Sequence, residues 1–297
     1  MKIGFIGLGK MGRHMAVNMF KHDTDIRVFD ANREILTELS NLGIPTASSP
    51  AEIGKLADVV FLSLPSAGVV EKVLFGEGGV IGDGAKRNII VDLGTTAYMK
   101  TLEFGSRLGS LGFKFADAPV SGMESRAASG ELTLMFGGEQ SVFDKIVPYF
   151  NMISNKVINF GGLGSGQMAK LINQLLFDIN TAALSEVLAL AAKLGLDPQK
   201  TVEVVTSGTG RSWAAEFFAP RILSGVFNEG YAMDNAYKDL VSASEISAQL
   251  RVPMPILSAA TAIYQMSLCK GLGNEGKGAM IKVYEEFLGA EFQDREV

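Results

Sequence analysis

Cysteine and histidine are both scarce in this chain, and each scarcity excludes a class of site. The one cysteine, Cys269, cannot form a disulfide within the chain, which fits a reducing compartment. The two histidines, His14 and His22, both lie near the N-terminus. A histidine-rich metal site and a triad with a histidine deep in the chain are therefore excluded, and we expect no metal. Acid–base chemistry must use another side chain.

Long apolar runs and an excess of positive charge are also lacking. No stretch reaches the roughly 20 apolar residues that a membrane helix needs, and the most apolar segment, Leu184–Ala192, is interrupted by Glu186. The N-terminal run Ile3–Ile6 is broken by glycines and Lys10 too early for a signal peptide. The net charge of -5 does not favour nucleic acid or an anionic membrane as a partner. We therefore expect a cytoplasmic globular protein.

The first half of the chain alternates strand and helix patterns. Its 297 residues suggest about two domains. Short apolar runs, typical of strands buried on both faces, occur at Ile3–Ile6, Ile26–Phe29, Val59–Leu64 and Asn88–Val91, and we expect Phe113–Ala116 and Leu132–Phe136 to extend the same sheet. Helical spacing appears over Met11–Lys21 and Arg33–Leu42, with Asp30 or Asn32 as the candidate cap of the second helix. The alternation predicts a Rossmann-type, doubly wound α/β domain over residues 1–163.

The pattern changes after a glycine cluster at residues 161–164. Ser165–Leu194 carries no strand signal and is apolar nearly all round. Such a helix must be buried on every face, between two domains or in a subunit interface. Gly195 ends it, and Asp197-Pro198 begins the next helix. Residues 164–297 are therefore predicted to form an all-α domain that includes this long helix and joins chains into a homodimer or homotetramer.

A glycine-rich turn follows the first strand. The run from Gly7 to Gly12, GLGKMG, fits the G-x-G-x-x-G pattern between a strand and a helix. The first glycine permits a tight turn, the second lets the backbone approach a pyrophosphate, and the third lets the helix pack on the strand. Asp30 closes the second strand, where a carboxylate could bind the adenosine ribose. The alternative is a plain turn with Asp30 as a helix cap.

Asp30 also bears on the choice of cofactor. A carboxylate at this position would repel a 2′-phosphate, so we expect NAD, with NADP less favoured. Arg33 is close by in the sequence, but it lies beyond the strand end, where a solvated helix residue is the plain explanation. The sequence therefore predicts an NAD-binding domain.

Lys170 is the candidate acid–base group, because it lies inside the apolar helix. A lysine on a buried helix is costly unless it is paired or functional, and burial lowers its pKa. Asn173 follows three residues later and shares the same helix face, so the two side chains could hold one oxygen. The alternative, a lysine that extends to solvent near the helix start, remains open on pattern alone.

The segment Asp117–Gly122, DAPVSG, ends a strand in a turn with a hydroxyl and small residues. Free N–H groups in such a turn suit a carboxylate. By chemistry alone, a simple β-turn is the favoured explanation.

The motifs come in a fixed order along the chain: Gly7–Gly12, Asp117–Gly122, Gly130–Thr133, Gly166–Asn173 and Lys238–Leu240. In this order they resemble the β-hydroxyacid dehydrogenase family, typified by 3-hydroxyisobutyrate dehydrogenase and tartronate semialdehyde reductase. The resemblance covers essentially the whole chain. It implies an NAD(P)-dependent oxidoreductase that interconverts a small β-hydroxy acid and its aldehyde or ketone.

The resemblance implies a role for each matching residue. Lys170 matches the family's catalytic lysine, and Asn173 matches the asparagine that orients the substrate. Ser121 and Gly122 match the turn that binds the substrate carboxylate, and Asp239 matches a position beside the family's substrate pocket. Together with the glycine turn, the implied cofactor-binding residues are Gly7, Leu8, Gly9, Met11, Gly12, Asp30, Leu64, Pro65, Thr95 and Lys238.

One departure from the family pattern follows Gly122. The family commonly has a second glycine there, whereas this chain has Met123, whose side chain could reshape the carboxylate site. Within the family, Gly208–Ser212, Tyr231–Asp234 and Ile281–Tyr284 look most like 2-(hydroxymethyl)glutarate dehydrogenase. The expected substrate is therefore of the 2-(hydroxymethyl)glutarate or 3-hydroxyisobutyrate type.

Three other kinds of protein share parts of the pattern. Imine reductases are similar to this family but usually replace the catalytic lysine, whereas Lys170 is present here. A non-catalytic dinucleotide-binding module should have lost that lysine or gained recognition domains. A 6-phosphogluconate dehydrogenase shares the first domain but has a longer helical domain. The dehydrogenase is the favoured hypothesis, and the imine reductase and the binding module remain the alternatives.

Overall fold

The computed structural model describes residues 1–22 and 25–293. The chain separates into two compact units, Met1–Lys170 and Leu171–Val297, and each has hydrophobic clusters of its own. The division falls inside the long helix α8, which runs from Ser165 to Lys193.

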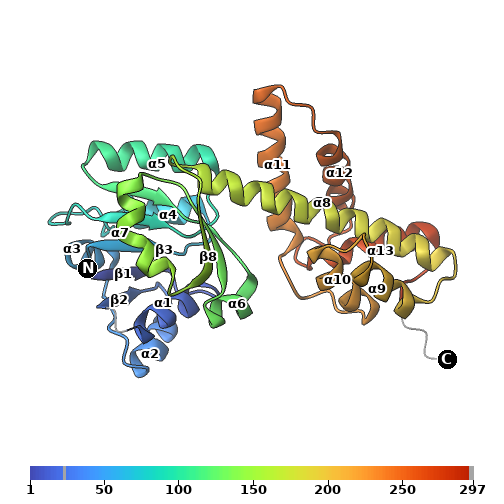
Figure 1. Ribbon diagram of the computed structural model, residues 1–297, viewed down its shortest axis with the longest axis horizontal. Coiled ribbons are helices and arrows are strands. Elements are labelled where there is room, and N and C mark those ends of the chain that lie inside the picture. Colours follow the sequence, from blue (N-terminus) through green and yellow to red (C-terminus); the bar gives the residue numbers. More distant parts are fainter. Residues whose placement is uncertain (23–24, 294–297) are drawn as a thin grey trace. The chain divides into compact units, whose positions relative to one another are not determined.

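The N-terminal unit is built on a five-stranded parallel sheet of order β2-β1-β3-β4-β5 (Figure 1). Its strands are β1 (Ile3–Ile6), β2 (Ile26–Phe29), β3 (Val59–Leu62), β4 (Ile89–Asp92) and β5 (Lys114–Asp117). This arrangement confirms the Rossmann-type sheet that the alternating pattern predicts. The carboxyl ends of parallel strands meet at one edge, so the residues that follow these strands are brought together there.

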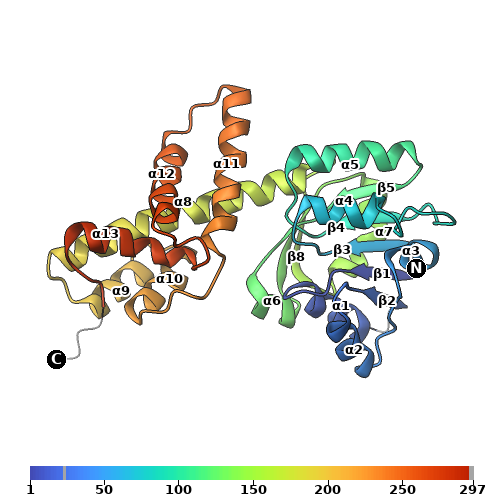
Figure 2. The ribbon, with the colours of Figure 1, turned by 180° about the vertical axis from the view of Figure 1, so that it is seen from behind.

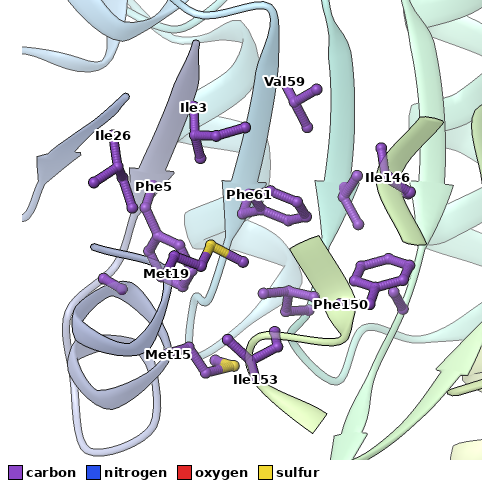
Figure 3. Close-up of a cluster of buried hydrophobic side chains, with 14 of the residues drawn as sticks. Ile3, Phe5, Met15, Met19, Ile26, Val59, Phe61, Ile146, Phe150 and Ile153 are labelled. Carbon is purple, nitrogen blue, oxygen red and sulfur yellow. The ribbon is translucent and has the colours of Figure 1, made fainter. Parts of the chain in front are cut away.

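Helices cover both faces of this sheet. They are α1 (Gly12–Lys21), α2 (Arg33–Asn41), α3 (Pro50–Leu56), α4 (Ala67–Phe75) and α5 (Tyr98–Ser110). Successive strand residues point to opposite faces: Phe5 belongs to one core cluster and Ile6 to the other. Figure 3 shows two methionines of α1 directed at the first of these clusters, Met19 beside Phe5 and Phe61, and Met15 beside Ile153. The sheet is thus buried on both sides, as near-continuous apolar strands require.

A second, three-stranded sheet of order β6-β7-β8 completes this unit. It comprises β6 (Val120–Ser121), β7 (Leu132–Phe136) and β8 (Ser154–Asn159), with α6 (Met123–Ser129) and α7 (Gln140–Phe150) between them. The expectation that Leu132–Phe136 extends the main sheet is therefore wrong. This segment pairs antiparallel with β6 and parallel with β8. An apolar run predicts a strand but does not identify its partners.

The second unit is helical. It contains α9 (Pro198–Ser207), α10 (Trp213–Leu223), α11 (Met233–Leu250), α12 (Pro255–Cys269), the 3₁₀ turn η1 (Lys277–Met280) and α13 (Ile281–Leu288), besides most of α8. Figure 2 shows α9 beside α10 and α11 beside α12. Gly195 adopts φ +72°, and the Asp197 side chain accepts a hydrogen bond from Lys200 N, as the predicted end of α8 and start of α9 require.

Helix α8 is less enclosed than its sequence suggests. Ile172, Leu176, Val187 and Leu190 are each at least half exposed. Burial on every face is therefore not achieved within one chain. By length and composition alone α8 could cross a membrane, although charged and polar residues interrupt its apolar runs. Half of its most apolar stretch is buried inside the chain.

Candidate dinucleotide and substrate site

The glycine-rich turn between β1 and α1 has the geometry that a dinucleotide needs. Gly7 has φ +96°, and a Cβ there would lie 2.2 Å from Ser63 O. A Cβ on Gly12 would lie 1.9 Å from Gly7 O, so this residue must be glycine for α1 to pack on the turn. A Cβ on Gly9 would meet no heavy atom within 4 Å, which leaves open space where a pyrophosphate could approach. The residues therefore fit the cofactor that the motif implies.

Asp30 is fixed beside this turn at the end of β2. Its Oδ2 accepts a hydrogen bond from Leu8 N at 2.6 Å, and its Oδ1 accepts one from Asn32 N at 2.8 Å. The cap of α2 is Asn32, whose side chain accepts from Glu34 N. Asp30 is therefore not the helix cap, and its carboxylate lies where the cofactor turn begins.

Two aspartates lie side by side at the carboxyl edge of the sheet. The sequence analysis included Asp117 only as the first residue of the Asp117–Gly122 motif and did not mention Asp92. Asp92 ends β4 and Asp117 ends β5, in register with each other. Asp92 accepts hydrogen bonds from Thr96 Oγ1 at 2.6 Å and Gly94 N at 2.9 Å. Burial raises the pKa of Asp92 to about 6 and that of Asp117 to about 6. Their signal in the sequence was an acidic residue closing each of two buried strands.

Asp117 anchors the start of α8. Its Oδ1 accepts from Gly164 N at 2.6 Å and its Oδ2 accepts from Gln167 N at 2.7 Å. The Gln167 side chain in turn donates to Gly94 O and accepts from Thr96 N. These bonds hold both neighbours of Thr95 and leave Thr95 itself exposed at this edge. Of the other predicted lining residues, Leu64 is half-buried and Pro65 is exposed.

Lys170 lies one turn beyond this anchor on α8. Only 9% of its surface is exposed. Asn173 follows three positions later on the same helix and is exposed. Gln174 and then Asp178 follow Lys170 at intervals of four residues, so these side chains line one face of α8. The helix therefore presents a polar face that begins at Lys170.

The predicted carboxylate turn combines two unusual backbone conformations. Ser121 ends β6, Gly122 has φ 141°, and Met123, with φ 48°, begins α6. Among the described residues, only Met123 and Arg251 are non-glycine residues with positive φ. The chain therefore accommodates the departure from a second glycine by placing methionine in the left-handed region, with its side chain partly exposed.

In the helical unit, the predicted residues Lys238 and Asp239 lie on α11. Lys238 is exposed, with Nζ 3.4 Å from Asn235 Oδ1. Asp239 Oδ2 accepts from Gln174 Nε2 at 3.4 Å. Asp239 thus lies close to the polar face of α8 within this unit.

A buried ion pair near Asp239 was missed by the sequence analysis. Lys277 Nζ lies 2.5 Å from Asp178 Oδ1, both side chains are fully buried, and the ammonium lies 3.4 Å from the centre of the Phe177 ring. Burial raises the pKa of Asp178 to about 6 and lowers that of Lys277, although the opposite charges partly offset both shifts. No local pattern marks Lys277, because its partner is 99 positions away.

Two family sequence models together cover most of the chain. The NAD-binding domain of 6-phosphogluconate dehydrogenase matches residues 2–162, and the NAD-binding domain of NADP-dependent 3-hydroxyisobutyrate dehydrogenase matches residues 164–284. The 2-(hydroxymethyl)glutarate dehydrogenase of Eubacterium barkeri is 37% identical, over 97% of this chain and 96% of that protein. The chain belongs to the β-hydroxyacid dehydrogenase family. It is an NAD(P)-dependent oxidoreductase.

Other members are similarly related. The 2-hydroxy-3-oxopropionate reductase of Escherichia coli is 31% identical, over 96% of this chain and 97% of that protein. A crystal structure of a 3-hydroxyisobutyrate dehydrogenase from Salmonella typhimurium has a TM-score of 0.86 at 29% identity, covering 95% of this chain and 99% of that one. A Streptomyces aurantiacus imine reductase, at 19% identity and a TM-score of 0.62, shares the fold alone.

Proposed function

We propose that this β-hydroxyacid dehydrogenase uses NAD to oxidise a small β-hydroxy carboxylic acid of the 2-(hydroxymethyl)glutarate or 3-hydroxyisobutyrate type, with Lys170 as the acid–base group. The observation that carries this proposal is the anchoring of α8. Asp117 fixes the start of α8 at the sheet edge where β1 enters the glycine turn, and Lys170 follows one turn later as a buried amine. A proton-transfer group is thereby held on a rigid element, which precise catalysis favours.

The cofactor, when bound, supplies the hydride acceptor. Lys170 as a neutral amine takes the hydroxyl proton at Nζ during oxidation, and as an ammonium it returns that proton to the carbonyl oxygen during reduction. Asn173 orients the same oxygen, while Ser121 and Gly122 bind the substrate carboxylate. Asp239 borders the substrate. The proposed cofactor-binding residues are Gly7, Leu8, Gly9, Met11, Gly12, Asp30, Leu64, Pro65, Thr95 and Lys238.

Lys170→Ala tests the mechanism. General acid–base catalysis contributes about 10²- to 10⁴-fold, so kcat should fall at least about 100-fold while NADH binding is kept. Lys170→Arg should recover little, because a guanidinium does not release its proton near neutral pH. The control is Lys193→Ala, which removes an exposed lysine from the other end of α8 and should keep kcat. Near-normal turnover in Lys170→Ala would place the acid–base group elsewhere.

The NAD preference rests on Asp30. Its carboxylate is held at the end of β2 by Leu8 N and Asn32 N, where it could bind ribose hydroxyls and repel a 2′-phosphate. We expect kcat/KM to be higher with NAD than with NADP. Asp30→Ala should reduce the ratio of kcat/KM with NAD to kcat/KM with NADP, mainly by lowering kcat/KM with NAD. A wild-type enzyme that prefers NADP would contradict this assignment.

Three broader features belong to the same proposal. The cofactor domain spans residues 1–163, and the substrate and oligomerisation domain spans residues 164–297. The exposed apolar residues of the helical unit, among them Leu176, Leu190 and Ile256, would be covered in a homodimer or homotetramer. A monomer in sedimentation at micromolar concentration would oppose that assembly. We place the enzyme in the cytoplasm, which cell fractionation can check.

An activity assay can identify which candidate acid is the best substrate. The 37% identity to the Eubacterium barkeri enzyme supports the 2-(hydroxymethyl)glutarate type. A panel of that acid, 3-hydroxyisobutyrate, glycerate, 4-hydroxybutyrate and serine, followed at the nicotinamide absorbance, would rank them. Oxidation of none of these acids would contradict the proposed function.

A further inference from the structure

A cluster of contacts joins α1 to α6 inside the N-terminal unit. Glu124 Oε1 lies 3.0 Å from Arg13 Nη2 and 3.1 Å from His14 Nε2. One turn further along each helix, the buried Asn18 side chain donates from Nδ2 to Ala127 O at 2.9 Å. The two helices are therefore fastened at two points, although they are more than a hundred positions apart in the sequence.

These two helices begin at the two halves of the proposed site. Helix α1 starts at Gly12, the last glycine of the cofactor turn, and Arg13 and His14 follow immediately. Helix α6 starts at Met123, directly after the Ser121-Gly122 turn assigned to the substrate carboxylate, and Glu124 follows. Glu124 is thus the side chain that connects one turn to the other.

The substrate turn has a particular need for such a restraint. Met123, at φ 48°, occupies a left-handed conformation that costs a non-glycine residue free energy. Left to itself, the turn would relax toward conformations with negative φ, and the N–H groups around Gly122 would be reoriented. Both side chains of the Arg13–Glu124 pair are more than a third exposed, so the pair adds little to global stability. Hydrogen bonds from His14 and then Arg13 lower the pKa of Glu124, so it remains a carboxylate at neutral pH.

We propose that Glu124 is a positioning residue. By binding Arg13 and His14, it fixes the position of the Ser121–Met123 turn relative to the Gly7–Gly12 cofactor turn. This inference rests on the proposed assignment of those turns. Loss of the Glu124 contacts should affect the substrate and not the cofactor. It should lower kcat/KM for the hydroxy acid, because misplacement of a bound group by about 1 Å can cost about 100-fold in rate. Cofactor binding should persist, because the glycine turn keeps its own hydrogen bonds, from Gly7 N to Phe29 O and from Leu8 N to Asp30 Oδ2.

Glu124→Ala tests the link against a matched control. Glu71→Ala removes a comparable ion pair in the same unit, in which Glu71 Oε1 lies 2.7 Å from Arg107 Nη1 at similar exposure. We expect kcat/KM for the best hydroxy acid to fall about 10- to 100-fold in Glu124→Ala, with NADH Kd and Tm changed no more than in the control. Glu124→Gln, which keeps an acceptor oxygen, should be intermediate. Equal kcat/KM in the two alanine variants would overturn the proposal.

A double-mutant cycle with Met123→Gly identifies the cause. Glycine adopts the left-handed conformation without strain, so the turn should no longer depend on the restraint. Glu124→Ala should therefore cost much less kcat/KM in the Met123→Gly background than in the wild type. An undiminished loss would show that Glu124 does not act through the turn.

Amide hydrogen exchange separates this inference from the proposed function. Exchange over residues 121–129 should accelerate in Glu124→Ala and stay unchanged in Glu71→Ala, whether or not a substrate is known. If the wild type oxidises no acid, the proposed function fails, yet the exchange result still decides the link. Unchanged exchange in Glu124→Ala would reject the link even in an active enzyme.

Discussion

The two units of this enzyme bury carboxylates in different ways. In the N-terminal unit, Asp92 and Asp117 receive hydrogen bonds from backbone N–H groups and a threonine hydroxyl. In the helical unit, Asp178 receives the ammonium of Lys277. The first arrangement uses donors that strand and helix ends leave free in any case. The second relies on a single charged side chain, so the two units should respond differently to mutation and to pH.

The largest expected effect is the loss of Lys277. Lys277→Met leaves Asp178 buried and uncompensated, which should lower the free energy of unfolding by about 3–5 kcal/mol. Urea unfolding followed by the fluorescence of Trp213, the one tryptophan, reports on the helical unit. Lys270→Met is the control, because its ion pair with Glu286 is exposed and should contribute less than about 1 kcal/mol.

The double variant Lys277→Met/Asp178→Leu sharpens this experiment. Replacing both charges by apolar side chains should restore most of the lost stability, since no unpaired ion remains. A Lys277→Met variant as stable as Lys270→Met would mean that the pair is not needed to neutralise Asp178, and the contrast between the units would disappear.

The pH response of the N-terminal unit is the smaller test. Burial raises the pKa of Asp92 from its ordinary 3.8 to about 6, so the folded state binds the proton more tightly than the unfolded state. The resulting contribution to stability is full below about pH 4 and is lost as the pH rises through about 6. Asp92→Asn removes this dependence. The free energy of unfolding of Asp92→Asn minus that of the wild type should therefore increase by on the order of 2–3 kcal/mol when the pH is raised from 4 to 7.

Urea unfolding at several pH values, followed by circular dichroism, measures that slope. Asp58→Asn is the control, and its stability relative to the wild type should change with pH in the opposite direction. The reason is that hydrogen bonds from Lys2 N and the Lys86 side chain lower the pKa of Asp58. The stability contributed by Asp58 is present above its ordinary pKa and lost as the pH falls. Parallel pH profiles for the wild type and Asp92→Asn would show that Asp92 does not titrate in this range.

Local sequence signals predicted the elements well. The turn Gly7–Gly12, the end of α8 at Gly195 and the cap of α9 at Asp197 all depend on the conformational limits of a few neighbouring residues. The apolar run at Leu132–Phe136 correctly predicted a strand. Its membership of a separate sheet could not be predicted, because pairing depends on residues far along the chain.

Tertiary partners account for what the sequence could not reveal about the site. Glu124 lies 111 positions from Arg13, and either residue alone is an ordinary surface charge. Asp117 was recognised within a motif, but its capping of α8 requires the loop at residues 161–164 to return to the end of β5. Similarly, the sequence left both Asp30 and Asn32 as candidate caps of α2, and the structure assigns the role to Asn32. Composition and spacing indicate which residues are candidates for the site, whereas the contacts between those residues depend on the tertiary fold.

The lone thiol has a practical consequence for work on this enzyme. Cys269 ends α12, carries no disulfide and is exposed, and it is the one cysteine in the chain. A maleimide dye, spin label or surface linker would therefore attach at one defined point of each chain. That point lies in the helical unit, so tethering there chemically modifies none of Met1–Lys170, where the proposed cofactor turn and Lys170 reside.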